Sequence, residues 1–242
     1  MTDPVIGINR VVQVLPRALS AWSETPIKAV GIGLVEAEPE AVDQQPAIID
    51  FDQMTDVVVT SPMAAQALTN ALYQRWPQWP VGIRYWAAGQ STADELPLDC
   101  HVEIAQPPGS QGLIPRMMDR LDASSRLLIC SQVGGGKQFD VLSECVGSLN
   151  HLELYRLTRL AEPDLPDLKH LTHVLHGAAS LLDAWFALPQ TILHEAQAVI
   201  HVVTSADAEL LLPAGTRYHR LESPTPHHVQ TVIQGEPRVK GI

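Results

Sequence analysis

The chain has 242 residues, of which 45% are hydrophobic and 18% charged, a composition typical of a globular protein and not of a disordered one. Lys and Arg number 16 against 27 Asp and Glu, so the formal net charge is -11, which argues against a general role on nucleic acid or an anionic membrane. The length suits one large α/β domain or two smaller ones, and we expect two lobes.

Targeting signals and cysteine motifs are both missing from the sequence. Residues 1–10 do not combine a charged segment with an apolar one, and no stretch approaches the ~20 apolar residues of a membrane span. We therefore expect a cytoplasmic protein without a membrane partner. Cys100, Cys130 and Cys145 lack CxxC spacing, so we interpret them as reduced and structural.

Short β-branched or apolar runs recur along the first part of the chain, each followed by a small or polar turn. The three best examples are Val57–Thr60 before Ser61-Pro62, Arg84–Ala88 before Gly89–Thr92, and Leu127–Cys130 before Gly134–Gly136. This alternation predicts α/β units with parallel sheets. All three turns would lie at strand carboxyl ends, where open α/β sheets bind ligands.

The same pattern starts again near residue 171. The predicted elements are a strand Leu171–His176, a turn Gly177–Ser180, a helix Leu181–Leu188, a strand Ala198–Val203, a turn Thr204-Ser205, a helix Ala206–Leu212, and a last helix Pro224–Gln234 with Ser223 as N-cap. The two halves therefore look like two versions of one lobe.

Two polar or proline-containing stretches, Glu36–Gln45 and Ala161–Lys169, are the predicted crossings between lobes. Two crossings mean that one lobe is inserted into the other. We predict a discontinuous α/β lobe of residues 1–36 and 168–242, an inserted α/β lobe of residues 46–158, and connections at 37–45 and 159–167. The fold class is α/β, with two flavodoxin-like lobes built on parallel sheets.

The turn Thr60-Ser61-Pro62 places two hydroxyls at a helix start, where exposed amides attract carboxylates or phosphates. Simple N-capping is the alternative for any one such residue. Similar turns at Ser91-Thr92, Ser110 and Thr204-Ser205 favour a shared anion-binding face.

The run Gly134-Gly135-Gly136-Lys137 invites comparison with a phosphate-binding loop. A Walker A motif needs glycine five residues before the last glycine and Ser or Thr after the lysine, but Ser131 and Gln138 stand there. We reject that motif and keep a glycine-rich turn that lets a ligand approach the backbone.

Neither the histidines nor the serines form a familiar catalytic or metal motif. His173 and His176 would fall on opposite faces of their strand, so no metal site is predicted from them. His227 and His228 diverge on a helix and are expected to face solvent. Tyr155, at the end of a predicted strand, could donate a proton or simply pack with its hydroxyl satisfied.

The order of these turns resembles that of the uroporphyrinogen-III synthase family. Thr60-Ser61-Pro62 is similar to the family's strand-TSP-helix element, and Ala88–Leu96 to its VGxxTAxxL element. The looser matches are Gly109–Leu113 to its SEGL helix start, Gly135–Arg156 to its segment from GGR to VYR, Asn9-Arg10 to its TR pair, and Ser223–Pro226 to its final helix start. The resemblance departs from the family at His176–Ala178, Val203–Ala206, Gln132 and Lys137.

The resemblance implies an enzyme that cyclises linear hydroxymethylbilane to uroporphyrinogen III with loss of water and inversion of ring D. The pathway would be tetrapyrrole biosynthesis, which leads to haem, sirohaem, chlorophyll and cobalamin. The family's chemistry loses the ring A hydroxyl to give an azafulvene, which the substituted carbon of ring D attacks before a spiro intermediate rearranges. Neither cofactor nor metal is implied, and a monomer that binds its substrate between two lobes is expected.

The site residues that the resemblance implies fall into two roles. Tyr155 is the candidate acid for the departing hydroxyl. The candidates for holding substrate carboxylates or lining their site are Arg10, Thr60, Ser61, Gln90, Ser91, Thr92, Ser110, Gly135, Lys137, Gly177, Ala178, Thr204 and Ser205. Arg156 is a further candidate cation.

Two other functions stay open at this point. The first is a two-lobed, non-catalytic or weakened homologue that binds an anionic small molecule without transforming it. The second is an enzyme that acts on a nucleotide through the same helix starts.

Overall fold

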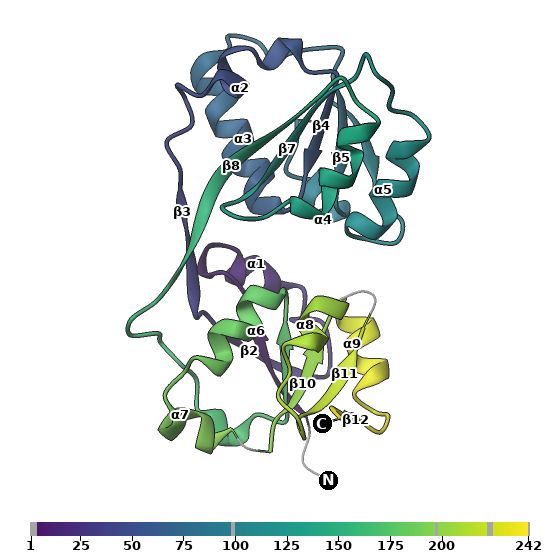
Figure 1. Ribbon diagram of the computed structural model, residues 1–242. Helices are drawn as coiled ribbons and strands as arrows, with labels where there is room; N and C mark the ends of the chain where they lie inside the picture. The colour runs from purple at the N-terminus through teal and green to yellow at the C-terminus, as the bar shows by residue number, and fades with distance from the viewer. Residues whose placement is uncertain (1–3, 98–99, 197, 222–224, 242) are drawn as a thin grey trace. The chain divides into compact units, whose positions relative to one another are not determined.

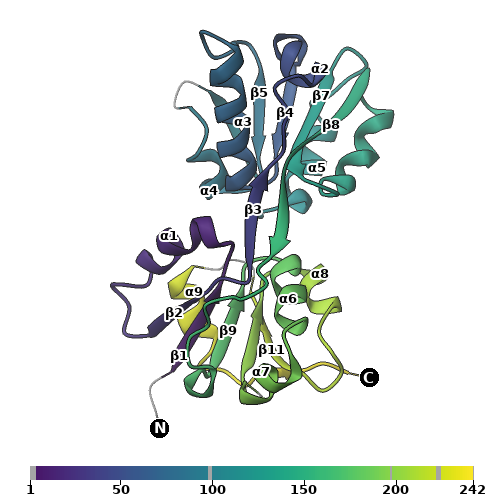
Figure 2. The same ribbon diagram turned by 90° about the vertical axis from the view of Figure 1, so that its left-hand side faces the viewer.

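The computed structural model describes residues 4–97, 100–196, 198–221 and 225–241. The chain divides into two compact units: unit 1 comprises Met1–Ala37 and Thr158–Ile242, and unit 2 comprises Glu38–Leu157. Each unit is a sheet with helices on both of its faces, so the predicted α/β class is confirmed (Figures 1 and 2). None of the helices in the described ranges is both long and apolar enough to cross a membrane.

Unit 1 has a six-stranded sheet in the order β12-β11-β10-β9-β1-β2. Its strands are β1 (Val5–Asn9), β2 (Lys28–Ile32), β9 (His173–His176), β10 (Ile200–Val203), β11 (Arg217–Arg220) and β12 (Arg238–Val239). All its pairs are parallel except β11 with β12, which is antiparallel. The prediction of parallel sheets is thus confirmed for five of these strands, and the two-residue strand β12 adds one antiparallel pair at the edge.

The helices of unit 1 cover both faces of that sheet (Figure 2). They are α1 (Leu15–Ser20), α6 (Ala179–Phe186), α7 (Gln190–Glu195), α8 (Ala206–Leu210) and α9 (Pro226–Val232), with short 3₁₀ helices at Val12–Val14 and Leu168–His170. α1 and α9 pack with Ile6, Ile8 and Val202 on one face, and α6 and α8 pack with Val203 on the other. Ser223, the predicted cap of the last helix, lies outside the described residues.

Unit 2 has a second six-stranded sheet in the order β3-β8-β7-β4-β5-β6. Its strands are β3 (Val35–Pro39), β4 (Asp56–Val59), β5 (Arg84–Ala87), β6 (His101–Ile104), β7 (Arg126–Gln132) and β8 (Ser148–Arg159). Its helices are α2 (Pro46–Ile49), α3 (Pro62–Arg75), α4 (Gln90–Ala93) and α5 (Ser110–Met118), with 3₁₀ helices at Phe51–Gln53 and Lys137–Glu144.

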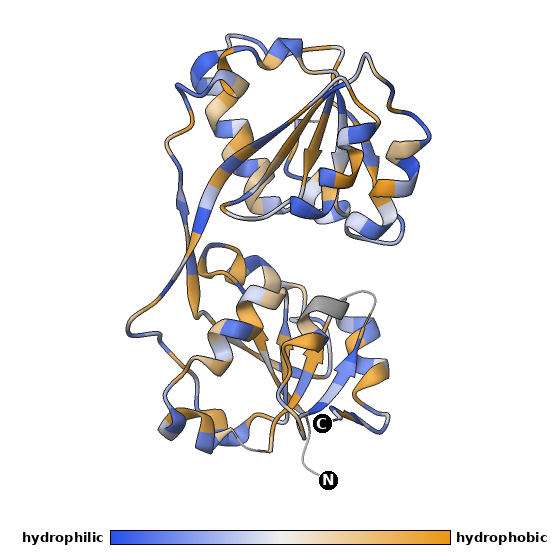
Figure 3. Ribbon diagram, in the orientation of Figure 1, coloured by the Kyte–Doolittle hydropathy of each residue, from blue (hydrophilic) through white to orange (hydrophobic). Residues whose placement is uncertain are grey.

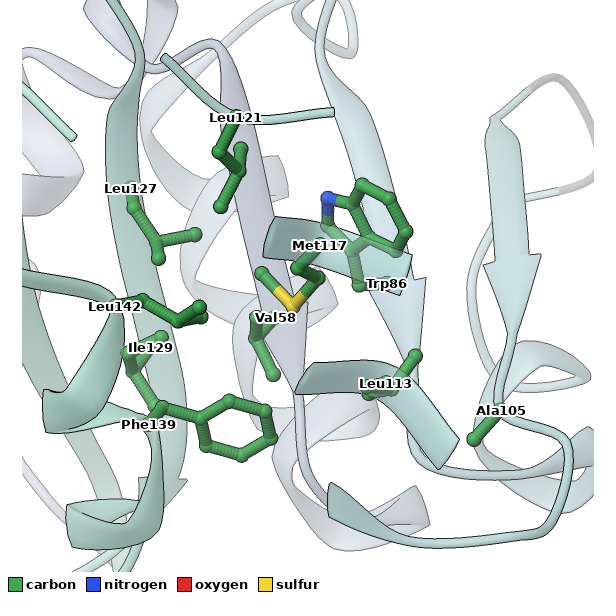
Figure 4. Packing of buried hydrophobic residues seen from close by; sticks show 10 residues of the cluster. All are labelled: Val58, Trp86, Ala105, Leu113, Met117, Leu121, Leu127, Ile129, Phe139 and Leu142. Atoms are coloured by element: carbon green, nitrogen blue, oxygen red, sulfur yellow. The ribbon is translucent and has the colours of Figure 1, made fainter. Parts of the chain in front are cut away.

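The core of unit 2 explains why the sequence shows continuous apolar runs there. All four residues of β4 are buried, as expected for a parallel strand covered on both faces. On one face, Val58 and Trp86 pack against Leu113 and Met117 of α5 (Figure 4). The central strands are correspondingly hydrophobic in Figure 3. The Trp86 indole N–H donates to the buried Asp56 carboxylate at 2.8 Å, so the polar tip of this side chain is satisfied.

The division between the units falls inside two strands. It lies between Ala37 and Glu38 in β3 and between Leu157 and Thr158 in β8. The first division lies inside the predicted crossing Glu36–Gln45, and the second lies just before the predicted crossing that begins at Ala161. The reason for the difference is that β8 continues to Arg159, so the chain passes from one unit to the other in extended, hydrogen-bonded conformation.

Candidate active site

The turns that follow the central strands of unit 2 lie side by side at one edge of the sheet. The Thr60 amide donates to Cys130 O at 3.1 Å, the Ala88 amide to Val59 O at 3.1 Å, and the Gly109 amide to Ala88 O at 2.7 Å. These bonds place the ends of β7, β4 and β5 in sequence along the carboxyl edge. Such an edge is the usual location of a ligand site in α/β proteins.

Ser61 caps the longest helix of unit 2. Its backbone is extended (φ -159°, ψ 160°), its Oγ accepts the Ala64 amide at 3.0 Å, and Pro62 occupies the first helical position. This is the arrangement that a Ser-Pro helix start predicts. The neighbouring hydroxyl of Thr60 is already committed, because it donates to Cys130 O at 3.0 Å.

Tyr155 reaches the same corner through an irregularity in β8. The register between β7 and β8 shifts between Ser131 and Gln132, which pair with Glu153 and Tyr155, so β8 carries one extra residue, Leu154. Leu154 and Tyr155 are both buried, with 1% and 6% exposure. A bulge changes the alternation of the side chains that follow it along a strand.

The Tyr155 hydroxyl lies 2.9 Å from Ser61 Oγ. Burial raises the pKa of the Tyr155 phenol above its ordinary value, and the hydrogen bond with Ser61 partly opposes that rise. At neutral pH the phenol is therefore protonated and can act as an acid. The pair Ser61 and Tyr155 is the central chemical feature of this edge.

The helix start at Gly89–Ala93 differs from its prediction. α4 is a single turn whose N-cap is Gly89, without a side-chain cap, and the Thr92 side chain is only 2% exposed. Thr92 therefore does not cap α4, and its role as a substrate contact stays a prediction. Ser91 is exposed, and the Gln90 amide nitrogen donates to the Asp94 carboxylate at 2.8 Å.

The next helix, α5, also begins at a glycine. Gly109 is its N-cap with φ of 98°, and Ser110 is the first helical residue without a capping hydrogen bond from its side chain. Gly112 in the first turn passes so close to the preceding turn that an added Cβ would overlap Pro107 O. Glycine at 112 thus lets the start of α5 pack against the segment before it, and Ser110 opens the helix at the carboxyl edge.

The glycine turn after β7 is the third predicted element at this edge. Gly134 and Gly136 have φ of 73° and 79°, which favours glycine at both positions. The Gly134 amide donates to the Glu153 carboxylate at 2.6 Å. A carboxylate of the chain itself thus occupies one backbone donor of the turn that was predicted to let a ligand approach the backbone. Lys137 follows the turn and is exposed.

Unit 1 has its own group of predicted residues at the carboxyl ends of β1, β9 and β10. The Arg10 guanidinium lies over Gly177, where an added Cβ would overlap Arg10 Nη1 and Cζ. Burial lowers the pKa of Arg10, and within the described residues no carboxylate pairs with its guanidinium. An unpaired, partly buried guanidinium is well suited to bind an anion.

A buried polar chain lies beneath Arg10. Asn9 Nδ2 donates to Leu181 O at 2.9 Å and meets His176 Nδ1 at 3.0 Å, and His176 Nε2 lies 2.9 Å from His201 Nδ1. Because an amide nitrogen can only donate, His176 must accept at Nδ1 and donate from Nε2 to His201. Burial lowers the pKa of both histidines, that of His201 to about 4, so both imidazoles are neutral.

The last predicted turn, Thr204-Ser205, repeats the local geometry of Ser61. Ser205 caps α8, with Oγ accepting the Ala208 amide at 3.1 Å. Ala178, which stands at the corresponding place before α6, is the N-cap of that helix but has no hydroxyl. Ser205 is therefore the counterpart of Ser61 at this edge, but among the described residues no tyrosine hydroxyl is bonded to it.

The structure thus arranges the predicted site residues in two groups, each at the carboxyl edge of its own sheet. The sequence did not indicate His201 or Glu153, and it gave Asn9 no partner, because the partners of these residues are far apart along the chain. In the described part of the chain, no group of three His, Cys, Asp or Glu side chains could hold a metal ion. A hollow of about 640 Å³ lined by Asp50 and Arg126 lies at the amino ends of the strands, away from Tyr155.

Comparison with solved structures supports the fold. A mutant uroporphyrinogen III synthase from the extremely thermophilic bacterium Thermus thermophilus matches with a TM-score of 0.53 and 13% sequence identity, covering 85% of this chain and 86% of the other. The wild-type enzyme from the same bacterium matches with a TM-score of 0.44 and 14% identity over 85% and 86% of the two chains. No protein-family model matches the sequence, and no curated protein does.

The fold is therefore that of a two-unit α/β protein with largely parallel sheets, similar to the fold of uroporphyrinogen III synthase. At 13% identity, this likeness concerns the fold alone. What the chain does has to be argued from its own side chains.

Proposed function

We propose that the chain is a uroporphyrinogen-III synthase, which closes hydroxymethylbilane into uroporphyrinogen III. The observation that carries the proposal is the pairing of Tyr155 with Ser61 at 2.9 Å, at the edge where the family-like turns meet. It supplies a protonated phenol beside helix starts that suit carboxylates. The fold that the chain shares with uroporphyrinogen III synthase is consistent with this function.

The first chemical step is loss of the hydroxyl from the ring A hydroxymethyl group. The pyrrole nitrogen supplies the electron pair that expels the hydroxyl, Tyr155 gives its phenolic proton to the departing oxygen, and water leaves. The substituted carbon of ring D then attacks the azafulvene, and the spiro intermediate rearranges. The phenolate recovers the proton that ring D loses when the macrocycle closes, so the enzyme returns to its starting state.

Orientation contributes more than acid catalysis in this proposal. Hydroxymethylbilane cyclises unaided to the isomer with ring D not inverted, so the protein must favour the strained path by holding the chain in one arrangement. Substrate carboxylates would bind to helix-start amides at Ser61 and Ser110, to the glycine turn, and to the cations Arg10 and Lys137. Backbone donors of this kind let a chain of net charge -11 bind an anion.

The direct test is incubation of purified protein with hydroxymethylbilane and separation of the product isomers. We expect uroporphyrinogen III, and Tyr155→Phe is expected to lower kcat about a hundredfold while the ring still packs. Arg10→Ala should raise KM with a smaller effect on kcat. If Tyr155→Phe keeps full kcat, Tyr155 is not the acid, even if the product is uroporphyrinogen III.

The second candidate function is that of a homologue that binds an anionic small molecule at its other helix starts and does not transform it. One observation supports it: the Glu153 carboxylate accepts the Gly134 amide, so this backbone donor is not available to a substrate carboxylate. Hydroxymethylbilane or a nucleotide would raise the melting temperature of such a protein in a thermal-shift assay, and the protein would leave the ratio of uroporphyrinogen I to III unchanged.

A further inference from the structure

The hydroxyl of Ser61 has little capacity left for a ligand. A serine hydroxyl has one proton to donate and two lone pairs to accept with. One lone pair takes the Ala64 amide at 3.0 Å, and a second contact, at 2.9 Å, is with the Tyr155 phenol. The Ser61 side chain is thus engaged on both sides by the protein itself.

The direction of the bond between the two hydroxyls decides what Tyr155 can do. If Tyr155 donates to Ser61, the phenolic proton is held inside the protein. If Ser61 donates to Tyr155, the phenolic proton is free to leave, and the Ser61 O–H remains bonded to the phenolate that forms. Only the second arrangement serves proton donation to a substrate, and a hydrogen bond to an ionised oxygen is stronger than one to a neutral oxygen.

We propose that Ser61 is a positioning residue that donates its hydroxyl proton to Tyr155 and stabilises the phenolate when the phenolic proton is transferred, rather than a residue that binds substrate. This inference rests on the proposed function, because it assigns a task to Tyr155. It changes the predicted role of Ser61 from a contact with substrate carboxylates to a contact with the acid.

The backbone around Tyr155 supports a fixed geometry. Its carbonyl accepts the Val133 amide at 2.8 Å, and the Leu154 carbonyl accepts the Glu40 amide at 3.0 Å. The bulge is thus held from two sides, and the phenol can turn only about its own side-chain bonds. Ser61 is held by its cap to α3, so both partners are on rigid elements, as a precisely placed proton donor requires.

The experiment uses Ser61→Gly and Ser61→Thr in the full-length protein. Glycine removes the hydroxyl with only a small loss of capping stability, and threonine keeps both the cap and the hydroxyl. Ser205→Gly is the matched control for stability alone, measured by urea denaturation, because Ser205 caps α8 in the same way and bonds to no tyrosine among the described residues. Tyrosine labelled with an NMR-active carbon at Cζ gives one signal for each of the four tyrosines, and Tyr155→Phe assigns the signal of interest.

We expect Ser61→Gly to shift the Tyr155 Cζ signal and to lower the acid dissociation constant of the phenol about tenfold, the effect of losing one hydrogen bond to the ionised form. The kcat for uroporphyrinogen III should fall about tenfold with KM within about twofold. Ser61→Thr should keep the acid dissociation constant of the phenol and kcat close to their wild-type values. In the Tyr155→Phe background, Ser61→Gly should have no further effect on kcat, because Ser61 would act only through the phenol.

An unchanged Tyr155 Cζ signal in Ser61→Gly would overturn the inference, as would a raised KM with unchanged kcat, which would make Ser61 a substrate contact. The inference would also be overturned if Ser61→Gly lowered kcat about tenfold in the Tyr155→Phe background, because the two residues would then act independently. Should the wild-type protein leave the isomer ratio unchanged, the proposed function fails, and the NMR titration alone then decides whether Ser61 donates to Tyr155.

Discussion

The four buried histidines of unit 1 make its stability depend on pH. His173 and His219 stack with ring centroids 5.9 Å apart, and His176 and His201 stack with centroids 5.2 Å apart. All four are 6% exposed or less, and burial lowers the pKa of each one, to about 4 for His173 and His201. The two described histidines of unit 2, His101 and His151, are exposed.

The sign and size of the effect follow from linkage. Because the pKa of a folded histidine lies below its unfolded value of about 6.5, the unfolded chain binds more protons as the pH falls, and unfolding becomes more favourable. Between pH 7 and pH 5, one histidine with a folded pKa of about 4 lowers the free energy of unfolding by about 2 kcal/mol. His173 and His201 together lose about 4 kcal/mol, a large part of the roughly 5–15 kcal/mol that stabilises a typical domain.

The assay is urea denaturation at pH 7.5 and at pH 5, followed by a hydrogen-exchange pulse at one fixed pH and mass spectrometry of peptides from each unit. We expect the urea midpoint of unit 1 to fall sharply at pH 5, while that of unit 2 changes little. His201→Asn keeps an acceptor for His176 and removes one titrating group, so it should reduce the pH dependence. His227→Gln with His228→Gln, both exposed, is the matched control. Equal loss in both units, or no loss in unit 1, would refute the reasoning.

Three further substitutions test separate contacts. Gly177→Ala should displace the flexible Arg10 guanidinium and raise KM about tenfold. The free energy of unfolding, measured by urea denaturation, should fall by less than about 1 kcal/mol. A changed free energy of unfolding with unchanged KM would contradict this prediction. Glu153→Gln should lower KM about two- to threefold at low salt and less at high salt, because it removes a negative charge from the glycine turn; a raised KM would show that the carboxylate is needed there. Gly112→Ala should destabilise unit 2 by at least about 2 kcal/mol, because its Cβ would overlap the Pro107 carbonyl, and an unchanged melting temperature would count against that packing.

The elements of the fold could be predicted because both sheets are covered by helices. A strand such as β4 is buried over its whole length, so it appears in the sequence as a short apolar run bounded by small or polar turns. The carboxyl-edge position of the turns followed from the same alternation. The edge strand β12 has only two residues, both exposed, and no pattern in the sequence distinguishes such a strand from a loop.

The candidate site was predictable in its parts but not in its contacts. Thr60-Ser61-Pro62 and Tyr155 stood out as residue types, yet their contact depends on β7 lying between β4 and β8 and on the register of β8, which shifts just before Tyr155. The local periodicity of the sequence predicts neither the order of the strands in a sheet nor the position of a bulge. The sequence also did not show that Thr92 is buried in α4, a single turn that begins after Gly89 without a side-chain cap.

The contacts of His176 in unit 1 could not be predicted from the sequence either. His176 faces His201 because β9 and β10 pair with His176 opposite Val203, which puts His201 on the same face two residues away. The sequence predicts that His173 and His176 lie on opposite faces of one strand, and their separate partners agree with this. The identity of those partners required the pairing register, which only the structure gives.

The isomer ratio of the product tests the central claim most directly. Hydroxymethylbilane should be generated freshly, mixed with increasing amounts of purified protein or of heat-denatured protein, and the oxidised products separated into uroporphyrins I and III. We predict that the share of isomer III rises with native protein until it accounts for almost all product, and that denatured protein has no effect. A share of isomer III that stays at the level of the unaided reaction at every protein concentration would contradict the account.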